Sequence, residues 1–441
     1  MNFLTRLLKP APHAEAIQDP DQVKKQYKYW RFRIFYSMYV GYAFYYFTRK
    51  SFTFAMPSMM QELGFDKSEL GILGSILSIT YGISKFASGI FGDRSNPRYF
   101  MALGLILTAL FNILFGLSST IVFFAIFWGL NGWFQGMGWP PCARLLTHWY
   151  TQSERGTWWG IWSTAHSVGG ALIPILATYC AQSYGWRYAM YVPGVLCLFA
   201  GLFLMNRLRD TPQSLGLPTI ERFKNEEHGE KSVERELSIR EILFKYVLKN
   251  KYVWILAISY FFVYVVRTAI NDWTILFLVE HKGYSVLSAG MGVFWFEVGG
   301  FVGTIFAGWA SDRIFKGRRA PMMIIFSAGV TLAVAAFWYV PAGNMMLDFM
   351  ALFAIGCLIF GPQMLTGIAA AELSHKKAAA TSSGFAGYFA YLGAAAAGYP
   401  LGKVAQDWGW HGFFIIVGIC GILVLALLIP LWSVKANPQA A

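Results

Sequence analysis

The sequence is poor in charged residues. Only 13% of its 441 residues are Asp, Glu, Lys or Arg, whereas 56% are hydrophobic and 18% are aromatic. Soluble proteins carry about 25% charged residues, so a soluble core cannot account for this much apolar surface. The composition therefore favours a membrane protein. Because each spanning helix needs about 20 mostly apolar residues, the chain has room for about a dozen spans.

Signatures of catalysis, of metal binding and of secretion are also missing. There is no GxxxxGK[ST] loop, no HExxH and no other cluster of metal ligands. The N-terminus lacks a basic-then-apolar stretch that ends in a small-residue cleavage site. We therefore expect no enzyme, no cofactor, no metal site and no removable signal peptide. The five cysteines lie in apolar runs without metal-ligand spacing, and we interpret them as small buried hydrophobes: Cys142, Cys180, Cys197, Cys357 and Cys420.

Positive charge is concentrated in two places. The net charge of +13 could indicate nucleic acid, but Lys and Arg lie between apolar runs rather than along a basic stripe. They gather before Ile34 and between Arg207 and Lys251. By the positive-inside rule these segments mark the cytoplasmic side, so both termini are expected there. No nucleic-acid partner is expected.

Apolar runs predict twelve spans in two groups of six. The first group is expected near 34–57, 70–91, 99–118, 120–143, 156–180 and 188–206, and the second near 252–280, 288–311, 321–340, 345–371, 378–402 and 411–432. The mixed-charge segment 221–231 is expected to be flexible. The predicted parts are a cytoplasmic tail 1–33, a six-helix half 34–206, a cytoplasmic linker 207–251, a second six-helix half 252–433 and a cytoplasmic tail 434–441.

The two groups of spans share features at one spacing. Asp93-Arg94 and Asp312-Arg313 are 219 residues apart, Arg49 and Arg267 are 218 apart, and Pro140 and Pro362 are 222 apart. Three pairs at nearly one offset indicate an internal repeat. The fold class expected is therefore an all-α membrane protein, with twelve transmembrane helices in two six-helix halves of the major facilitator kind. In such folds the binding site lies between the halves at mid-membrane.

Arg49 and Arg267 lie well inside predicted spans, at corresponding places in the two halves. An arginine at mid-membrane costs at least about 2.5–3.5 kcal/mol, so something must hold it there. One interpretation is a structural ion pair or a snorkelling side chain. The other is an anion held between the two guanidiniums, whose forked donors suit phosphate.

Further side chains fall at helical spacing around the arginines. An aromatic stripe is also typical of ordinary packing or of an interfacial belt. Lys85 is close enough to a span end to snorkel, and His166 is either a satisfied core histidine or a titrating cation that binds phosphate. The set that shares faces in this way is Tyr42, Tyr46, Tyr81, Lys85, Gln135, Trp139, Trp162, His166 and Tyr264.

Asp272 and Glu297 also lie inside predicted spans, and their negative charge would oppose anion binding. Lys50 stands about 100° around the helix from Arg49, so it need not point into the cavity. A network of Lys50 with Asp272 and Glu297 would neutralise charge across the halves and break during alternating access. A purely structural bridge remains the alternative.

Several segments together resemble the organophosphate:phosphate antiporters, and the resemblance covers the chain from about Tyr29. They are Gly41-Tyr-Ala-Phe-Tyr-Tyr-Phe-Thr-Arg-Lys50, Thr80-Tyr-Gly-Ile-Ser-Lys85, Phe134-Gln-Gly-Met-Gly-Trp-Pro-Pro-Cys142, Ala165-His-Ser-Val-Gly-Gly170, Tyr264-Val-Val-Arg267, Phe360-Gly-Pro-Gln-Met-Leu365 and Phe389-Ala-Tyr-Leu-Gly393.

The resemblance implies a function and roles for residues. Arg49 and Arg267 would bind phosphate with help from His166, and inorganic phosphate would leave as an organophosphate enters. It implies a bacterial inner membrane, a monomer, and a gating network of Lys50, Asp272 and Glu297. It also implies substrate-site roles for Tyr42, Tyr46, Tyr81, Lys85, Gln135, Trp139, Trp162, Tyr264 and Tyr391.

Within that family, three segments look most like its membrane receptors for external glucose 6-phosphate: Ala269-Ile-Asn-Asp-Trp273, Cys142-Ala-Arg-Leu-Leu-Thr147 and Gly170-Ala-Leu-Ile-Pro174. Hexose-phosphate transporters would carry an Asp and a Lys where this chain has Ser383 and Ala386. Ser163 and Phe360 replace the Asn and Tyr of the glycerol-phosphate carriers. The expected function is exchange of a hexose 6-phosphate for phosphate. The alternatives are a receptor that activates a membrane sensor kinase, and a glycerol 3-phosphate exchanger.

Overall fold

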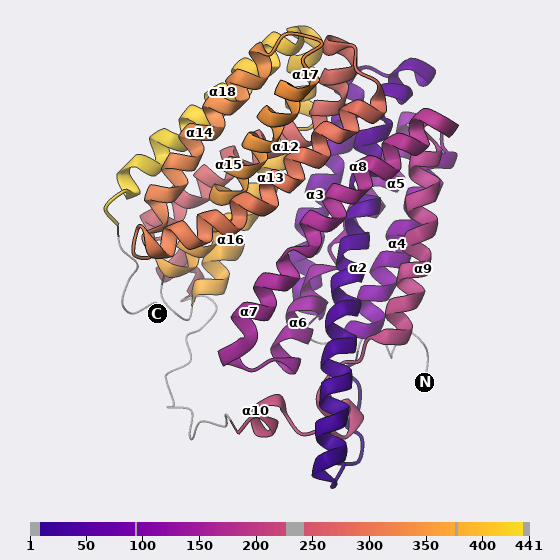
Figure 1. The fold of residues 1–441 in the computed structure, drawn as a ribbon, viewed down its shortest axis with the longest axis vertical. Helices are drawn as coiled ribbons and strands as arrows, with labels where there is room; N and C mark the ends of the chain where they lie inside the picture. The colour runs from indigo at the N-terminus through magenta and orange to yellow at the C-terminus, as the bar shows by residue number, and fades with distance from the viewer. Residues whose placement is uncertain (1–8, 93–94, 226–241, 375–377, 435–441) are drawn as a thin grey trace. The chain divides into compact units, whose positions relative to one another are not determined.

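The computed structural model describes residues 9–92, 95–225, 242–374 and 378–434, and these residues form helices and no strand (Figure 1). The N-terminal part holds α2 (Pro20–Leu63), α3 (Lys67–Gly92), α4 (Pro97–Leu117), α5 (Ile121–Gln135), α6 (Trp139–Trp149), α7 (Gln152–Ser163), α8 (Ala165–Tyr184), α9 (Tyr188–Arg207), the 3₁₀ turn η1 (Pro212–Leu215) and α10 (Ile220–Phe223). The C-terminal part holds the π-turn η2 (Ile242–Val247), α12 (Lys251–Lys282), α13 (Val286–Arg313), α14 (Arg319–Tyr339), α15 (Met345–Glu372), α16 (Ala379–Ala396), α17 (Tyr399–Asp407), α18 (Gly409–Leu428) and η4 (Ile429–Leu431).

Seven of the described helices are long and apolar enough to cross a membrane: α4, α9, α12, α13, α14, α15 and α18. The other five predicted spans correspond to α2, α3 and three pairs of shorter helices, α5/α6, α7/α8 and α16/α17. Two of these pairs are divided just before a proline, Pro140 in α6 and Pro400 in α17. Proline lacks an N–H group and is favoured in the first turn of a helix, so the chain restarts a helix at each break.

Helix α2 begins well before the first predicted span. It starts at Pro20 rather than near Ile34, and the backbone N–H of Asp21 donates to Asp19 Oδ1 at 3.0 Å. A proline in the first turn preceded by an acidic side chain is a helix-start signal that hydropathy does not detect.

The chain divides into two compact units. Unit 1 contains Met1–Phe52, Thr80–Ala177 and Arg187–Glu234, and unit 2 contains Thr53–Ile79, Thr178–Trp186 and Arg235–Ala441. Three of the boundaries fall inside α2, α3 and α8, so each of these helices contributes residues to both units.

Unit 1 has a buried polar network that joins α2 to α5. Gln135 Nε2 donates to Tyr45 O at 3.1 Å and to Thr48 Oγ1 at 2.9 Å, and Asn131 Nδ2 donates to Thr48 O at 3.0 Å. These side chains are at most 1% exposed. Buried polar groups that are satisfied in this way fix the register of neighbouring helices.

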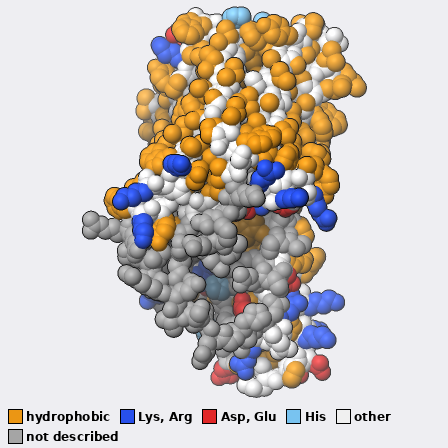
Figure 2. Space-filling view, turned by 90° about the vertical axis from the view of Figure 1, so that its left-hand side faces the viewer, with side chains coloured by type: hydrophobic (Ala, Val, Ile, Leu, Met, Phe, Trp, Pro, Cys, Tyr) orange, Lys and Arg blue, Asp and Glu red, His pale blue; other side chains and the backbone are white. Residues whose placement is uncertain are grey.

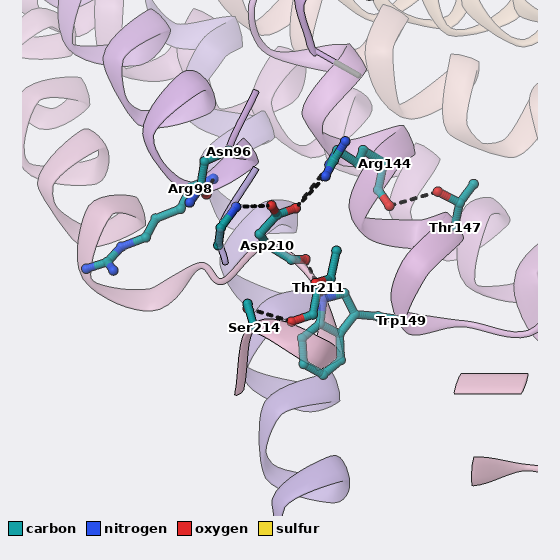
Figure 3. A network of polar contacts seen from close by, with 9 residues as sticks. Asn96, Arg98, Arg144, Thr147, Trp149, Asp210, Thr211 and Ser214 are labelled. Carbon is teal, nitrogen blue, oxygen red and sulfur yellow. Dashed lines mark hydrogen bonds and ion pairs between the residues drawn. The ribbon is translucent and has the colours of Figure 1, made fainter. Parts of the chain in front are cut away.

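A second network in unit 1, which we call the tail platform, joins the chain before α2 to the segment after α9 (Figure 3). Asp210 accepts hydrogen bonds from Ala11 N at 2.8 Å and from Arg144 Nε at 3.0 Å, and Arg144 Nη2 lies 3.0 Å from Asp210 Oδ1 in an ion pair. Ala14 N and Ile17 N donate to carbonyls of residues 213 and 216. The tail platform comprises residues 11–17 and 208–223 together with Arg144.

Part of the segment predicted to be flexible also belongs to this platform. Residues 220–223 form α10, and the Phe223 ring stacks on Tyr27 of α2 with centroids 4.1 Å apart. The prediction of flexibility is therefore wrong for residues 221–223, because an aromatic anchor fixes them. Residues 226–231 lie outside the described part of the chain, as do Asp93 and Arg94.

Unit 2 is packed through glycines. A Cβ placed on Gly299 or Gly303 of α13 would overlap the backbone of α15 at Phe353 or Cys357. Glycines at these two positions let the backbones of α13 and α15 approach closely. The segment Thr53–Ile79 is tied to the rest of the unit by Lys67, whose Nζ lies 2.8 Å from Glu280 Oε2, and by Ser75 Oγ, which donates to Ala395 O at 2.6 Å.

Large apolar side chains are exposed along many of the helices, for example Ile305, Leu332 and Ile422 in unit 2. On the face drawn in Figure 2, hydrophobic side chains cover the upper part, and Lys and Arg side chains gather along the border of this area. An exposed apolar face of this extent is typical of contact with lipid.

Candidate functional site

Arg49 of α2 lies in an aromatic cluster of unit 1. Its guanidinium carbon is 4.6 Å from the centre of the Tyr46 ring and 4.3 Å from that of Tyr81. Its Nε donates to Gln135 Oε1 at 3.2 Å. Because Gln135 is itself held by the backbone of α2, the arginine has a fixed position. The structure thus brings Tyr46, Tyr81 and Gln135 together with Arg49, and their role in binding a substrate stays a prediction.

The remaining predicted residues of unit 1 continue this cluster. The Tyr42 ring lies 4.8 Å from Trp162, and the Tyr46 ring lies 6.0 Å from His166. Lys85 Nζ lies 5.4 Å from the centre of the Trp139 ring. We call this set the Arg49 cluster: Tyr42, Tyr46, Arg49, Tyr81, Lys85, Gln135, Trp139, Trp162 and His166.

His166 has a defined orientation. Its Nδ1 forms a short hydrogen bond with the carbonyl of Ser163, one turn earlier across the α7/α8 junction. A carbonyl can only accept, so Nδ1 carries the proton and Nε2 is the ring nitrogen that gains or loses one. The imidazole can therefore offer Nε2 to an anion as a donor once it is protonated.

Arg267 of α12 is the centre of a comparable arrangement in unit 2. Its guanidinium carbon lies 4.8 Å from the centre of the Phe360 ring and 5.7 Å from that of Tyr264. The Tyr264 ring in turn lies 5.8 Å from Tyr391 and 5.0 Å from Tyr260. We call these five residues the Arg267 cluster. Each cluster thus places one arginine against the faces of two aromatic rings.

Glu297, one member of the predicted charge network, has a hydrogen-bond partner within unit 2. Glu297 accepts from Asn271 Nδ2 at 3.0 Å, and both side chains are only 2% exposed. Asp272 follows Asn271 on α12. Lys50 belongs to unit 1, so the network of Lys50 with Asp272 and Glu297 stays a prediction.

Sequence reasoning missed several members of the two clusters. Phe360 was named in a family segment and as a departure from the glycerol-phosphate carriers but was given no role, yet its ring lies closer to Arg267 than that of Tyr264. Trp159 links Trp139 and Trp162, with ring centroids 5.8 and 6.0 Å away. The spacing of Trp159 and Trp162, three residues apart on one helix face, was a signal for its role.

The family model of the Major Facilitator Superfamily matches residues 38–398. The chain belongs to this superfamily. The match covers most of both predicted halves, and it bears out the expected all-α fold with twelve transmembrane helices.

Relatives within the superfamily cover nearly the whole chain. A "Probable hexose phosphate transport protein" of Chlamydia trachomatis is 58% identical over 98% of each chain. "Membrane sensor protein UhpC" of Escherichia coli is 47% identical over 98% of this chain and 99% of its own. The "Glycerol-3-phosphate transporter" of Bacillus subtilis is 44% identical over 98% of each. These relatives confirm the organophosphate:phosphate antiporter family.

Solved structures agree on the fold alone. A bacterial homolog of the human lysosomal transporter Spinster, inward-facing and occupied, is 14% identical with a TM-score of 0.73, over 91% of this chain and 97% of that one. The nucleoside transporter NupG is 13% identical with a TM-score of 0.71, over 90% of this chain and all of that one.

The chemistry of both clusters suits a phosphoryl group. The guanidinium of arginine carries its N–H donors in a planar fork, and phosphate oxygens fit that fork. Within the described ranges no three His, Cys, Asp or Glu residues come together as a metal site would require.

Proposed function

We propose that the protein is a secondary transporter that exchanges a sugar phosphate for inorganic phosphate by alternating access. The sugar phosphate we favour is a hexose 6-phosphate. It is not an enzyme and uses no cofactor. Arg49 and Arg267 bind the phosphoryl group that the two substrates share, and the other residues of the two clusters bind the rest of the organic substrate. Lys50, Asp272 and Glu297 form the gating network.

The observation that carries this proposal is the equivalence of the two arginines. Arg49 and Arg267 stand 218 residues apart, and each lies on two aromatic rings inside its own unit. A mid-membrane arginine is costly, so two of them in corresponding places indicate one shared task. The relatives named for hexose phosphate and for glycerol 3-phosphate have a phosphoryl group in common among their substrates.

The arginines are tested by Arg49→Lys and Arg267→Lys in purified protein. Each variant should lose most of its affinity for both phosphate and glucose 6-phosphate, because an ammonium cannot reproduce the bidentate fork. Arg222→Lys, on an exposed position of α10, is the matched control and should bind as the wild type does. Near-normal phosphate affinity in Arg267→Lys would contradict the proposal that both arginines bind the phosphoryl group.

Coupling is tested in proteoliposomes that contain only this protein. Uptake of labelled glucose 6-phosphate should be rapid with phosphate inside and slow without it, because an empty cavity with two cations resists reorienting. Glycerol 3-phosphate, offered in parallel, decides between the two organic substrates. Equal uptake into vesicles without any internal substrate would contradict exchange.

A receptor is the second candidate function. The similarity to the membrane sensor protein UhpC over nearly the full length favours it, and the tail platform supplies a folded surface outside the spans that a sensor kinase could contact. Binding of glucose 6-phosphate without any exchange, together with loss of a sugar-phosphate response on gene deletion, would replace the transporter proposal.

The placement follows from the same proposal. The protein resides as a monomer in a bacterial inner membrane, with both termini and the linker 207–251 in the cytoplasm. Its halves are 34–206 and 252–433, and residues 1–33 and 434–441 are the tails.

A further inference from the structure

Four arginines gather where α9 ends in unit 1. They are Arg33 of α2, Arg98 of α4, Arg207 at the last turn of α9 and Arg209 just beyond it. No carboxylate in the described part of the chain lies within ion-pair distance of any of them. We call this set the α9 arginine cluster. It is separate from the Arg49 cluster and from the ion pair of Asp210 with Arg144, and Figure 3 shows the Arg98 side chain extending away from that pair.

Backbone carbonyls hold three of these arginines together. Arg33 Nη2 donates to the carbonyl and to the side-chain oxygen of Asn206 at 3.2 Å each. Arg209 Nη1 donates to Asn206 O at 2.9 Å and to Leu208 O at 2.7 Å, and Arg98 Nε donates to Met205 O. Arg33 and Arg209 therefore share one acceptor atom, which brings two full positive charges together.

The helix end does not neutralise this charge. The C-terminus of a helix is equivalent to about half a negative charge, against three arginines that bind to it. The pKa of Arg209 is lowered by burial first, and then by the positive charges of Arg98 and Arg33. The cluster therefore carries an excess of positive charge that a bound anion would relieve.

Donors remain available for such an anion. Arg33 Nε is buried and has no acceptor among the described residues. Arg209 donates only through Nη1 and Arg98 only through Nε, so most of the five N–H groups of each guanidinium are unused by the described residues. Their common location would allow two arginines to bind one phosphate group.

The surroundings of the cluster are apolar and exposed. The Trp30 ring lies 4.9 Å from the guanidinium carbon of Arg33 and 5.0 Å from that of Arg209. Phe32, next to Arg33, is 71% exposed. Phe199 and Leu202 lie on α9 before the cluster and are 66% and 57% exposed. A soluble anion gains nothing from these exposed apolar side chains, whereas the acyl chains of a lipid would pack against them.

We propose that the α9 arginine cluster binds the phosphate headgroup of an anionic phospholipid, whose acyl chains lie along Phe199 and Leu202. Basic pockets between spanning helices on the cytoplasmic side suit phospholipid headgroups of this kind. The inference rests on the proposed membrane placement, but it does not depend on which solute is carried.

The test compares lipids bound to the purified protein. Wild-type protein in a zwitterionic detergent is titrated with phosphatidylglycerol and with phosphatidylcholine, and retained lipid is counted by native mass spectrometry. We expect preferential retention of phosphatidylglycerol, and a loss of about tenfold or more in that preference for the double variant Arg33→Gln/Arg209→Gln. Arg222→Gln removes one positive charge from an exposed position of α10 and should retain the preference.

Two further measurements keep the outcome decisive. Excess inorganic phosphate or glucose 6-phosphate should not displace the lipid, and displacement by either would show that the cluster is a site for soluble anions. If the double variant does not fold, the preference of the wild type should still fall steeply with ionic strength. Salt-independent lipid preference, or equal phosphatidylglycerol retention by a folded double variant, would overturn the proposal. Loss of exchange activity alone would bear on the transporter proposal and not on this one.

Discussion

Replacing Asp210 by asparagine should release the N-terminal tail from the tail platform. The side chain of Asp210 is fully buried, accepts hydrogen bonds from Ala11 N and from Arg144 Nε, and forms an ion pair with Arg144 (Figure 3). Asparagine keeps one oxygen, so its NH₂ group must face either Arg144 or the Ala11 N–H, with donor against donor. Removing one partner of a buried ion pair costs about 3–5 kcal/mol. Because the Arg144 side chain is 10% exposed, water relieves part of this cost, and about 3 kcal/mol is expected.

An energy of about 3 kcal/mol corresponds to roughly a hundredfold change in the docking equilibrium. Amide hydrogen exchange measures that change locally, because the amides of Ala14 and Ile17 are bonded to the platform only while the tail is docked. Their exchange should accelerate by up to about a hundredfold in Asp210→Asn. Asp407→Asn is the matched control. Asp407 is half exposed, and its ion pair with Lys403 is long, at 3.8 Å, so its removal should cost little. Unchanged protection of Ala14 and Ile17 in a folded Asp210→Asn protein would refute this reasoning.

Three further predictions concern the two units. Gln135→Ala should weaken phosphate binding by about tenfold, because Arg49 Nε loses its acceptor, and isothermal titration that finds unchanged affinity would contradict this role. Gly303→Ala should destabilise unit 2 by about 1–3 kcal/mol through overpacking, seen as a lower melting temperature, whereas Gly384→Ala has open space and should melt as the wild type does. Asp272→Asn should slow exchange in proteoliposomes far more than it weakens equilibrium binding, and a parallel loss of both would argue against a gating role.

The spans and the arginine faces could be predicted because each depends on neighbours along one helix. Hydropathy identified twelve apolar runs, and spacings of three and four residues placed Tyr46 near Arg49 and Tyr264 near Arg267. These periodicities follow from helix geometry alone. The family resemblance then supplied Tyr391, which no local spacing indicates.

The rest depends on contacts between distant segments. Ala11 binds Asp210 across 199 residues, and neither segment is apolar or periodic. Hydropathy and periodicity therefore did not indicate the tail platform. Asn271 binds Glu297 from a different helix, and hydropathy does not indicate this contact. The break between α5 and α6 was missed because the apolar run that contains both helices is uncharged. Pro140 and Pro141 were sequence signals for a helix start at this place.

The division of α2, α3 and α8 between the two units has a mechanical consequence. At these three places the chain passes from one unit to the other within a continuous helix, so the connection has the stiffness of a helix and not of a loop. Pro57 lies inside α2, and its nitrogen cannot donate to the carbonyl of Thr53, the first residue of unit 2 on that helix. Pro174 lies inside α8 one turn before Thr178, the first residue of unit 2 on that helix. Helices bend most easily where a proline removes a hydrogen bond, so Pro57 and Pro174 mark the points at which α2 and α8 bend most easily.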